Sequence, residues 1–422
     1  MNKKSPFPKG FYWGASTASH QVEGGTHNQW TEWELASATH LAKIAKQRLD
    51  WTPRWQEIQK QAEDPANYIS GKGVGHYDMH DLDFAIIKKL NLNSFRCGIE
   101  WSRVEPEEGV WDKKQWDYYR VYIQKLLDAG IEPFLNIWHW TVPTWFSDKD
   151  GFAKKENILY FERFVAKLCH ELQIKELRYI ITLNEPNVYT SFGYITGEWP
   201  PQQKNVLTAM LVYKNLVIAH KRSYKILKEA NSHLQVGVAA QLGNIQAKRP
   251  HHIFDQTVTK LMRYGWNWWF LNRIRRYQDF VGFNYYFTDY YKGFSRKNPT
   301  IPVNDLGWYM EPEGVYPLLL SVWAHYKKPI IITENGLADE KDEQRRWWLE
   351  QTMVAMERAI SEGVDVRGYM HWSLLDNFEW AYGWWPKFGL VAVDRQNHMK
   401  RTVRPSAIWW AEWIKRNSSN LL

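Results

Sequence analysis

Cysteine is scarce in this chain, which has only Cys97 and Cys169 in 422 residues. Two cysteines cannot form the disulfide framework of a small secreted protein, so the fold must rest on burial and hydrogen bonding, and a reducing compartment is tolerable. The opening MNKKSPFPKGF contains no apolar core of a secretory signal. No run approaches the roughly 18 apolar residues that a membrane span needs. The sequence therefore predicts a cytoplasmic protein with no membrane partner.

Clustered charge of one sign is also missing. The formal net charge is +8 and the sequence pI about 9.1, but the basic residues lie in short, scattered pieces. These pieces are Lys88-Lys89, Lys154-Lys155, 273–276 and Arg345-Arg346. A nucleic-acid-associated protein remains an alternative class, but it would need clustered positive charge and strongly salt-dependent binding. We therefore expect solvated helix faces and no nucleic-acid partner.

The glycine-rich turn of a dinucleotide-binding fold is absent as well. The first apolar run is followed by SHQVEGG, which lacks the GxGxxG spacing, and the glycine-rich stretch 70–75 follows no strand-like run. This argues against an open, doubly wound sheet.

Short runs rich in β-branched and aromatic residues recur eight times, and most are followed by an amphipathic stretch. The runs are Phe11–Ala18, Ser94–Trp101, Glu132–Trp138, Tyr179–Glu185, Leu234–Gln241, Asp279–Tyr286, Pro329–Glu334 and Val366–Leu374. Helix patterns fill intervals at Leu82–Leu90, Trp116–Ala129, Ile158–Leu172 and Gln344–Glu362. Eight strands that alternate with helices predict parallel pairing and a closed (β/α)8 TIM barrel of the α/β class.

One domain accounts for residues 1–422, although the length alone would allow two or three. The longest interval lies between the first two strands. Its middle, Leu35–Gln61, is charged and helix-prone, and the glycines up to Gly75 end it. The segment 35–75 is too short to bury a core of its own, so we interpret it as an elaborated first βα loop.

Two carboxylates close predicted strands. Glu185 ends the fourth run in ITLNEPN, and Glu334 ends the seventh in IIITENG. A buried strand end is an expensive place for an unpaired charge, and in this barrel the active site forms where the strands end. Either residue alone is compatible with a salt-bridged strand end. The pair matches what glycosidic bond cleavage requires, namely one acid for the leaving oxygen and one carboxylate for the developing positive carbon.

These motifs make the chain resemble glycoside hydrolase family 1, the retaining β-glucosidase and β-galactosidase family. The similarity runs from FPKGFYWGASTASHQVEGG through TLNEP and TENG to KFGLVAVD and RPSAIWW, and so covers nearly the whole chain. The resemblance implies that Glu185 is the general acid/base and Glu334 the nucleophile. It further implies a double displacement on terminal nonreducing β-D-glucosyl residues, with no cofactor and no metal. The implied substrate is a small oligosaccharide or an aryl or alkyl β-glycoside.

Other positions match the family's sugar-binding pattern, and their side chains suit hydroxyl groups and pyranose faces. The resemblance assigns the nonreducing sugar to Gln21, His139, Trp140, Asn184, Trp372, Glu379 and Trp380. It assigns support of the nucleophile to Arg96, Tyr286 and Asn284, because a guanidinium and a phenol would keep Glu334 ionised. In a retaining enzyme the two carboxyls lie about 5–5.5 Å apart, and ionised Glu334 should raise the pKa of Glu185.

Several alternatives stay open. A preference for galactose, fucose or mannose, or a noncatalytic sugar-binding barrel, would use the same pocket residues. His76 and His80 with Asp83 could suggest a metal site, but no third ligand is evident beside them. The connection between strands five and six is about thirty residues shorter than is usual in the family's barrel. The long first loop is hypothesised to fold over the same opening.

Several of the 26 tryptophans can be grouped by the part of the sequence in which they lie. Trp140, Trp372 and Trp380 fall on motif positions, where stacking on sugar is the expected use. Those in helix-like stretches are expected to pack in the core, namely Trp266, Trp268, Trp269, Trp347 and Trp348. Those beside the first loop or the last motif are expected to extend the cleft wall, namely Trp30, Trp33, Trp384 and Trp385.

Overall fold

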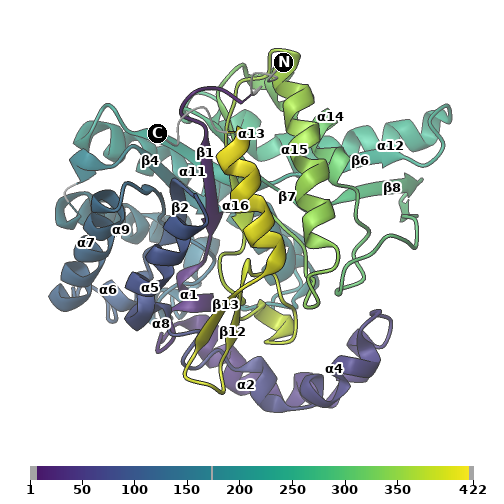
Figure 1. The fold of residues 1–422 in the computed structure, drawn as a ribbon. Helices are drawn as coiled ribbons and strands as arrows, with labels where there is room; N and C mark the ends of the chain where they lie inside the picture. Colours follow the sequence, from purple (N-terminus) through teal and green to yellow (C-terminus); the bar gives the residue numbers. More distant parts are fainter. Residues whose placement is uncertain (1–6, 173, 418–422) are drawn as a thin grey trace.

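The computed structural model describes residues 7–172 and 174–417, and its centre is a closed barrel of eight parallel strands (Figure 1). The order around the barrel is β1-β11-β10-β7-β5-β4-β3-β2. The strands are β1 Tyr12–Ser16, β2 Ser94–Gly98, β3 Glu132–Asn136, β4 Tyr179–Asn184, β5 Gln235–Gln241, β7 Val281–Tyr285, β10 Ile330–Asn335 and β11 Val366–Trp372. Each falls on one of the eight predicted runs or overlaps it within one residue. The predicted (β/α)8 barrel is therefore confirmed.

The interior of the barrel is filled at the end where the strands begin. A cluster of seven buried side chains there is separate from the larger core between strands and helices, and consists of Phe134, Tyr179, Ile181, Ala239, Phe280, Ile331 and Met370. Gly14 of β1 leaves room for this layer, since a Cβ there would lie 2.3 Å from the sulfur of Met370. Because this end is packed, only the opposite end of the barrel is free to form a cavity.

Sixteen α-helices in the described part of the chain surround the barrel or lie in its loops. Those of the outer layer include α5 His76–Lys89, α7 Lys113–Asp128, α9 Ile158–Glu171, α11 Val206–Ala230, α13 Trp269–Ile274, α14 Val315–Tyr326, α15 Arg345–Ser361 and α16 Pro405–Asn417. All four predicted helices are found, but α5 begins six residues and α7 three residues before the apolar pattern. In α7 the Asp112 side chain accepts from the amides of Lys114 and Gln115, so the helix begins at its cap.

The loops carry shorter helical segments. The α-helical ones outside the first loop are α6 Trp101–Val104, α8 Thr144–Ser147 and α10 Pro186–Ser191. The 3-10 and π turns are η2 Gly151–Ala153, η3 Lys155–Asn157, η4 Ile174–Glu176, η5 Phe192–Thr196, η6 Tyr264–Trp268, η7 Pro312–Gly314 and η8 Trp380–Tyr382. A two-stranded hairpin of β12 Val391–Asp394 and β13 Lys400–Val403 precedes α16.

The first βα loop is helical, as its sequence predicts. It contains α1 Ser19–Val22, α2 Gln29–Lys43, α3 Ala45–Leu49, α4 Trp55–Ala62 and η1 Pro65–Tyr68. A capping box between Asn28 and Thr31 starts α2. In Figure 1 these purple helices run across the end of the barrel toward which β1 points. The loop therefore lies at the mouth of the barrel.

A side lobe projects from the barrel between β5 and α14. A small three-stranded sheet of β6 Asn244–Ala247, β8 Thr288–Lys292 and β9 Ser295–Arg296 packs against helix α12 Ile253–Arg263. In Figure 1 α12 and β8 extend outward, well beyond the ring of helices. We call residues 244–264 and 288–300 the side lobe.

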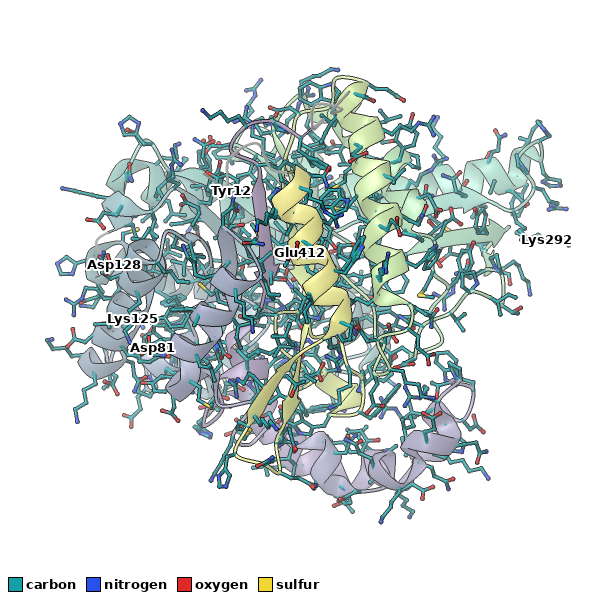
Figure 2. All side chains as sticks on the ribbon, in the orientation of Figure 1. Tyr12, Asp81, Lys125, Asp128, Lys292 and Glu412 are labelled. Atoms are coloured by element: carbon teal, nitrogen blue, oxygen red, sulfur yellow. The ribbon has the colours of Figure 1, made fainter. Side chains whose placement is uncertain are left out.

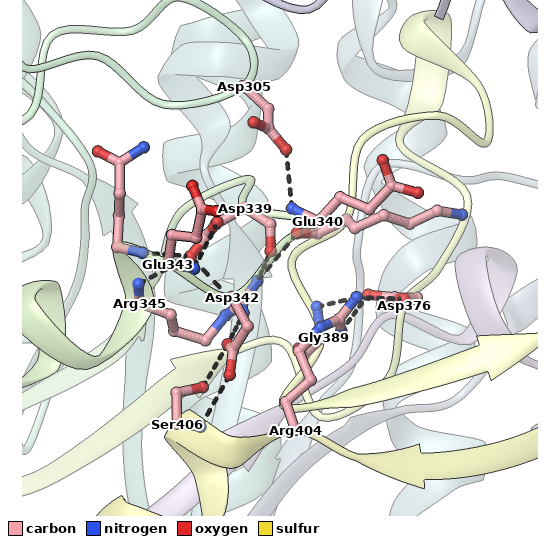
Figure 3. A network of polar contacts seen from close by, with 12 residues as sticks. Asp305, Asp339, Glu340, Asp342, Glu343, Arg345, Asp376, Gly389, Arg404 and Ser406 are labelled. Carbon is pink, nitrogen blue, oxygen red and sulfur yellow. Dashed lines mark hydrogen bonds and ion pairs between the residues drawn. The ribbon is translucent and has the colours of Figure 1, made fainter. Parts of the chain in front are cut away.

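Buried ion pairs and hydrogen bonds connect the loops after β10 and β11 to the start of the C-terminal helix (Figure 3). The fully buried Arg345 pairs with Asp342, whose other contacts are the amide and hydroxyl of Ser406 at the start of α16. Asp376 forms two bonds with Arg404, at 2.8 and 2.9 Å. This network holds the loop that follows Glu334 against the C-terminal part of the chain.

Cys97 is buried and Cys169 half-buried, and both are free thiols. Within the two described ranges we find no helix that combines the length and the apolar character of a membrane span.

Candidate active site

A cavity of about 750 Å³ opens at the end of the barrel where the strands terminate. Eight of the twelve predicted site residues line it, namely His139, Trp140, Glu185, Tyr286, Glu334, Trp372, Glu379 and Trp380. They come from the ends of five strands, β3, β4, β7, β10 and β11, or from the loops that follow them. The eight residues are spread over more than two hundred positions of sequence, and barrel closure brings them together.

Glu185 and Glu334 both stand where a strand loses its regular register. Glu185 follows β4 at φ 42° and ψ 59°, a left-handed backbone that is strained for a residue with a side chain. The pairing of β4 with β5 shifts between Ile181 and Asn184, and that of β10 with β7 shifts between Ile332 and Glu334. Such bulges redirect side chains beside active sites, and here they direct two carboxylates into one cavity.

A buried polar network joins the two carboxylates. Arg96, which is fully buried in β2, forms an ion pair with Glu334 through one nitrogen and donates to Asn184 Oδ1 through another at 2.7 Å. Asn284 donates to the same Asn184 oxygen at 3.1 Å and to Glu185 Oε1 at 2.8 Å. Its own oxygen accepts from Thr333 at 2.6 Å, which fixes the orientation of the amide. The network therefore holds Glu185 and Glu334 in one rigid frame.

The two carboxylates have different electrostatic surroundings. Burial raises the pKa of Glu185 well above its ordinary value, and the charge of Glu334 raises it further. Burial also raises the pKa of Glu334, but the guanidinium of Arg96 and the hydroxyl of Tyr286, which donates at 2.9 Å, oppose that shift. Glu334 is therefore the carboxyl that ionises first, while Glu185 keeps its proton.

Aromatic rings and one imidazole form the wall beside the carboxylates. Trp140 and Trp380 lie 4.7 Å apart, and both occupy left-handed backbone conformations at φ 74° and φ 48°. His139 stacks on Trp380 at 6.0 Å and lies 5.8 Å from Trp372. Burial and the charge of Arg96 lower the pKa of His139, so its ring is neutral and can both donate and accept hydrogen bonds.

Four predicted residues lie behind the cavity wall. Arg96, Asn184 and Asn284 act on the two glutamates rather than line the space themselves. Gln21 donates to the Phe378 carbonyl at 2.6 Å and to Asn377 at 3.2 Å, and its buried Oε1 has no protein partner among the described residues. Gln21 thus holds the segment that carries Glu379.

Glu379 has a raised pKa that affects stability. Burial and the charge of Glu334 raise the pKa of Glu379 to about 8, and its buried Oε2 has no partner among the described residues. The folded state therefore keeps a proton that an unfolded chain has already lost, and stability falls as pH rises from about 4.5 to about 8. We expect Glu379→Gln to flatten this fall and to raise the Tm at pH 8 by a few degrees.

Calorimetry between pH 5 and 8.5 would test the expected effect of Glu379→Gln. Glu229→Gln, on the exposed face of α11, is the matched control. Parallel Tm curves for Glu379→Gln and the wild type would contradict the expectation.

The sequence missed much of the outer cavity. Additional lining residues are Arg48, Trp51, Glu198, Trp199, Gln241, Met262, Trp266, Phe287, Asp289, Tyr291, Arg296, Asn298, Trp308 and Tyr309, among others. Trp266 was expected to pack in the core, but its indole N–H bonds Gln241 at the cavity wall. Its stretch is a π-helix, which alters the side-chain directions that a regular helical pattern predicts.

The tryptophans expected to extend the cleft wall do not line the cavity. Trp33, Trp384 and Trp385 are buried and absent from its lining, and so is Trp30, which packs 4.6 Å from Trp380. That expectation was wrong, because the rings pack behind the wall.

The first loop contributes directly to the cavity, in agreement with the hypothesis that it folds over the opening. Arg48 and Trp51 line the outer part, and the Arg48 guanidinium donates to the Ala381 carbonyl at 3.2 Å. Trp51 lies against Gly307, where a Cβ would come within 2.6 Å of its ring. Arg54 anchors the segment through Asp305 at 2.9 Å and Glu340 at 2.6 Å.

We expect Arg54→Ala to loosen this loop because it removes the anchoring ion pairs. For the glycosidase activity that the sequence resemblance implies, the KM for cellooligosaccharides should rise by about three- to tenfold, while kcat/KM for a nitrophenyl glycoside changes by less than about twofold. Limited proteolysis should cut within 44–62 faster than in the wild type. Arg222→Ala, which removes a surface pair with Glu162, is the control. An unchanged KM for long substrates would show that the loop does not shape the outer cavity.

The histidine pair of α5 is used in packing. His76 contacts Asp83 at 2.7 Å through one ring nitrogen and Tyr122 at 2.8 Å through the other. Asp83 also receives two bonds from Arg401. Both ring nitrogens of His76 are therefore engaged by protein groups. Elsewhere in 7–172 and 174–417, no group of three or more acidic, histidine or cysteine side chains has a metal-binding arrangement.

Comparison with known proteins reveals relatives over the full chain. The model of Glycosyl hydrolase family 1 matches residues 3–277 and 270–419. Beta-glucosidase A of Thermotoga maritima is 31% identical, with 99% of each chain covered. A beta-galactosidase of Sulfolobus acidocaldarius is 27% identical, with 97% of this chain and 95% of the relative covered. The structure of the Thermotoga maritima beta-glucosidase in complex with glucoimidazole superimposes with a TM-score of 0.86 at 28% identity, covering 98% and 99%.

The two parts of the family match meet at residues 270–277. This is the connection between β5 and β7 in which the sequence predicts a shortened segment.

Proposed function

The chain belongs to glycosyl hydrolase family 1, and we propose that it is a retaining β-glycosidase in which Glu185 is the acid/base and Glu334 the nucleophile. The observation that carries the assignment of roles is the asymmetry around the two carboxyls. Glu334 has Arg96 and Tyr286 as partners, whereas the only hydrogen bond to the Glu185 carboxyl from a side chain of the described residues comes from an uncharged amide. The carboxylate that ionises first is suited to attack, and the one that keeps its proton is suited to donate it.

In the first step a Glu334 oxygen bonds to the anomeric carbon, and the bond to the leaving oxygen breaks as that oxygen takes the proton of Glu185. Formation of the ester neutralises Glu334, so the pKa of Glu185 falls. Glu185 is then a base that removes a proton from water as the water oxygen displaces Glu334. Two inversions at one carbon leave the β configuration in the product.

We further propose that the preferred substrates carry a terminal nonreducing β-D-glucosyl residue. Glu379 and Trp380 line the cavity, and Trp380 stacks on His139, so that these side chains suit sugar hydroxyls and a pyranose face. Relatives named for β-glucosidase and β-galactosidase activity both resemble the chain, so β-galactosides and β-fucosides are included as substrates. The two free thiols suit a reducing compartment such as the cytoplasm.

A panel of nitrophenyl β-glucoside, β-galactoside, β-fucoside and β-mannoside tests the proposal. We expect the highest kcat/KM for the β-glucoside or β-fucoside, and NMR spectra at early times should show the β sugar as the first product. An α sugar as the first product would overturn the retaining mechanism. Binding of glucose without hydrolysis of any substrate would favour a noncatalytic barrel.

A further inference from the structure

The side lobe concentrates the positive charge of the molecule. It contains seven cationic residues, Lys248, Arg249, Lys260, Arg263, Lys292, Arg296 and Lys297, and two acidic ones, Asp255 and Asp289. These 34 residues therefore carry a net of five positive charges, whereas the whole chain of 422 carries +8. The sequence shows only short basic pieces, because β6 and β8 are separated along the chain and become neighbours on folding.

Both acidic side chains of the lobe already bind neighbouring groups within it. Asp255 is buried and accepts two bonds from Arg249, at 2.8 and 2.9 Å, together with the amide of Gly293. Asp289 faces Arg296 at 3.8 Å and accepts from Asn298. The five other cations of the lobe have no ion pair with a carboxylate in the described residues. Their charge is therefore available to a partner.

Apolar side chains are exposed at the outer end of the same lobe. Ile253 is 82% exposed, Phe254 52% and Phe294 74%. The rings of Phe254 and Phe294 lie 6.0 Å apart and edge to face, so the start of α12 and the β8–β9 turn meet at one point. We call these three side chains the apolar tip.

Lysines flank the apolar tip. The Lys248 amide donates to the Tyr291 carbonyl at 2.8 Å, which places Lys248 beside the end of β8, where Lys292 lies. Figure 2 shows Lys292 at the outer edge of the lobe. The inner face of α12 is fixed by buried Asp255, Val258 and Thr259, so the exposed residues cannot turn inward. The tip is therefore a rigid apolar surface bordered by positive charge.

We propose that the apolar tip and its lysines dock this enzyme on an anionic lipid bilayer surface. Aliphatic and phenyl groups gain free energy when they enter the boundary between headgroups and acyl chains, and lysines beside them are attracted to anionic headgroups. A nucleic acid would use the lysines but leave Ile253, Phe254 and Phe294 in water. A second copy of the chain would bring like charges together across a two-fold axis. An anionic bilayer surface offers an apolar boundary to the three tip side chains and negative charge to the lysines beside them.

This docking is peripheral and goes beyond the proposed hydrolysis. It departs from the prediction of no membrane partner, which rested only on the lack of an apolar run long enough to span a membrane. Neither the three residues of the apolar tip nor Lys248 and Lys292 line the active-site cavity. Their replacement should therefore alter membrane binding while activity on a water-soluble nitrophenyl glycoside is retained. For the same reason, failure of the docking proposal would leave the proposed hydrolysis intact.

Co-sedimentation of the full-length protein with vesicles tests the docking. We expect binding to phosphatidylcholine vesicles that contain phosphatidylglycerol, and at least about tenfold weaker binding to pure phosphatidylcholine. The triple variant Ile253→Ser, Phe254→Ser, Phe294→Ser should weaken binding by about tenfold or more, and Lys248→Glu with Lys292→Glu by about twentyfold. High salt should weaken binding of the wild type.

Matched controls change exposed residues elsewhere. Leu159→Ser on α9 replaces an equally exposed apolar side chain, and Lys89→Glu with Lys225→Glu reverses two charges on α5 and α11. The controls should bind vesicles within about threefold of the wild type. The proposal is overturned if the wild type does not bind anionic vesicles or if the controls lose as much binding as the tip variants. Tighter binding to a DNA duplex, or a dimer that the triple variant abolishes, would also overturn it.

Discussion

Glu334→Ala should lower kcat/KM for nitrophenyl β-glucoside by about 10⁴-fold or more, because no group remains to form the covalent intermediate. The loss of activity should be similar for substrates with good and with poor leaving groups, because every substrate needs the attack of Glu334 on its anomeric carbon. Retention of near-wild-type activity would exclude Glu334 as the nucleophile.

The structure adds a second consequence of this substitution. Without Glu334 the buried guanidinium of Arg96 loses its charged partner, and among the described residues it keeps only the side chain of Asn184 as a hydrogen-bond acceptor. An uncompensated buried charge is strongly destabilising, so we expect a lower Tm together with affinity for small anions at the vacated position. Azide bound there would face the sugar from the side that Glu334 occupied. Glu334→Ala with azide should therefore release α-glycosyl azide, which NMR identifies.

A control is needed because a lower Tm alone could reduce activity. Glu105 is fully buried away from the cavity and accepts from the Trp101 indole at 2.8 Å and the Gly109 amide at 2.9 Å. Glu105→Gln should also lower the Tm, but at a temperature where it is folded kcat/KM should stay within about threefold of the wild type. If Glu105→Gln lost activity as severely as Glu334→Ala, the loss would reflect unfolding and not chemistry.

The barrel could be predicted from sequence because the strands are short, mostly apolar runs that are almost entirely buried. Ile330–Asn335 shows this: isoleucines fill both faces, and the run stops at Glu334 and Asn335. The first residue of a helix is harder to predict from apolar periodicity, because a polar capping residue determines where the helix begins. Asp112 starts α7 one turn before the first apolar residue, and a periodicity of apolar residues does not register a polar cap.

The inner site could be predicted for the same reason, whereas the outer cavity could not. Glu185 and Glu334 stand at the ends of strands, and the order of the strands along the chain determines where each strand end lies around the barrel. Arg48, Trp51 and Trp308 come from loops with no such constraint, and their meeting depends on contacts such as Trp51 with Gly307. The positive charge of the side lobe could not be predicted for a similar reason, because Lys248 follows β6 and Lys292 ends β8, two strands that lie far apart in the sequence.

Glu185→Ala should affect substrates according to their leaving groups. Dinitrophenolate needs little protonation to depart, so kcat/KM for dinitrophenyl β-glucoside should fall by less than about tenfold. An alkyl β-glucoside should lose about 10³-fold or more, because its alkoxide cannot leave without a proton. Hydrolysis of the intermediate should also slow, so a burst of dinitrophenolate should precede the steady state. Equal losses for both substrates would contradict the assignment of Glu185 as the acid.

The pH profile and azide separate this role from a structural one. In the wild type, kcat/KM should fall at low pH as Glu334 gains a proton and at high pH as Glu185 loses its proton. Because the raised pKa of Glu185 defines the alkaline limb, Glu185→Ala should lose that limb and keep the acid limb. Azide should restore turnover through β-glycosyl azide, since it approaches from the side that Glu185 occupied and attacks an α-linked intermediate. The two variants should therefore give azides of opposite configuration, an outcome that a general loss of stability cannot produce.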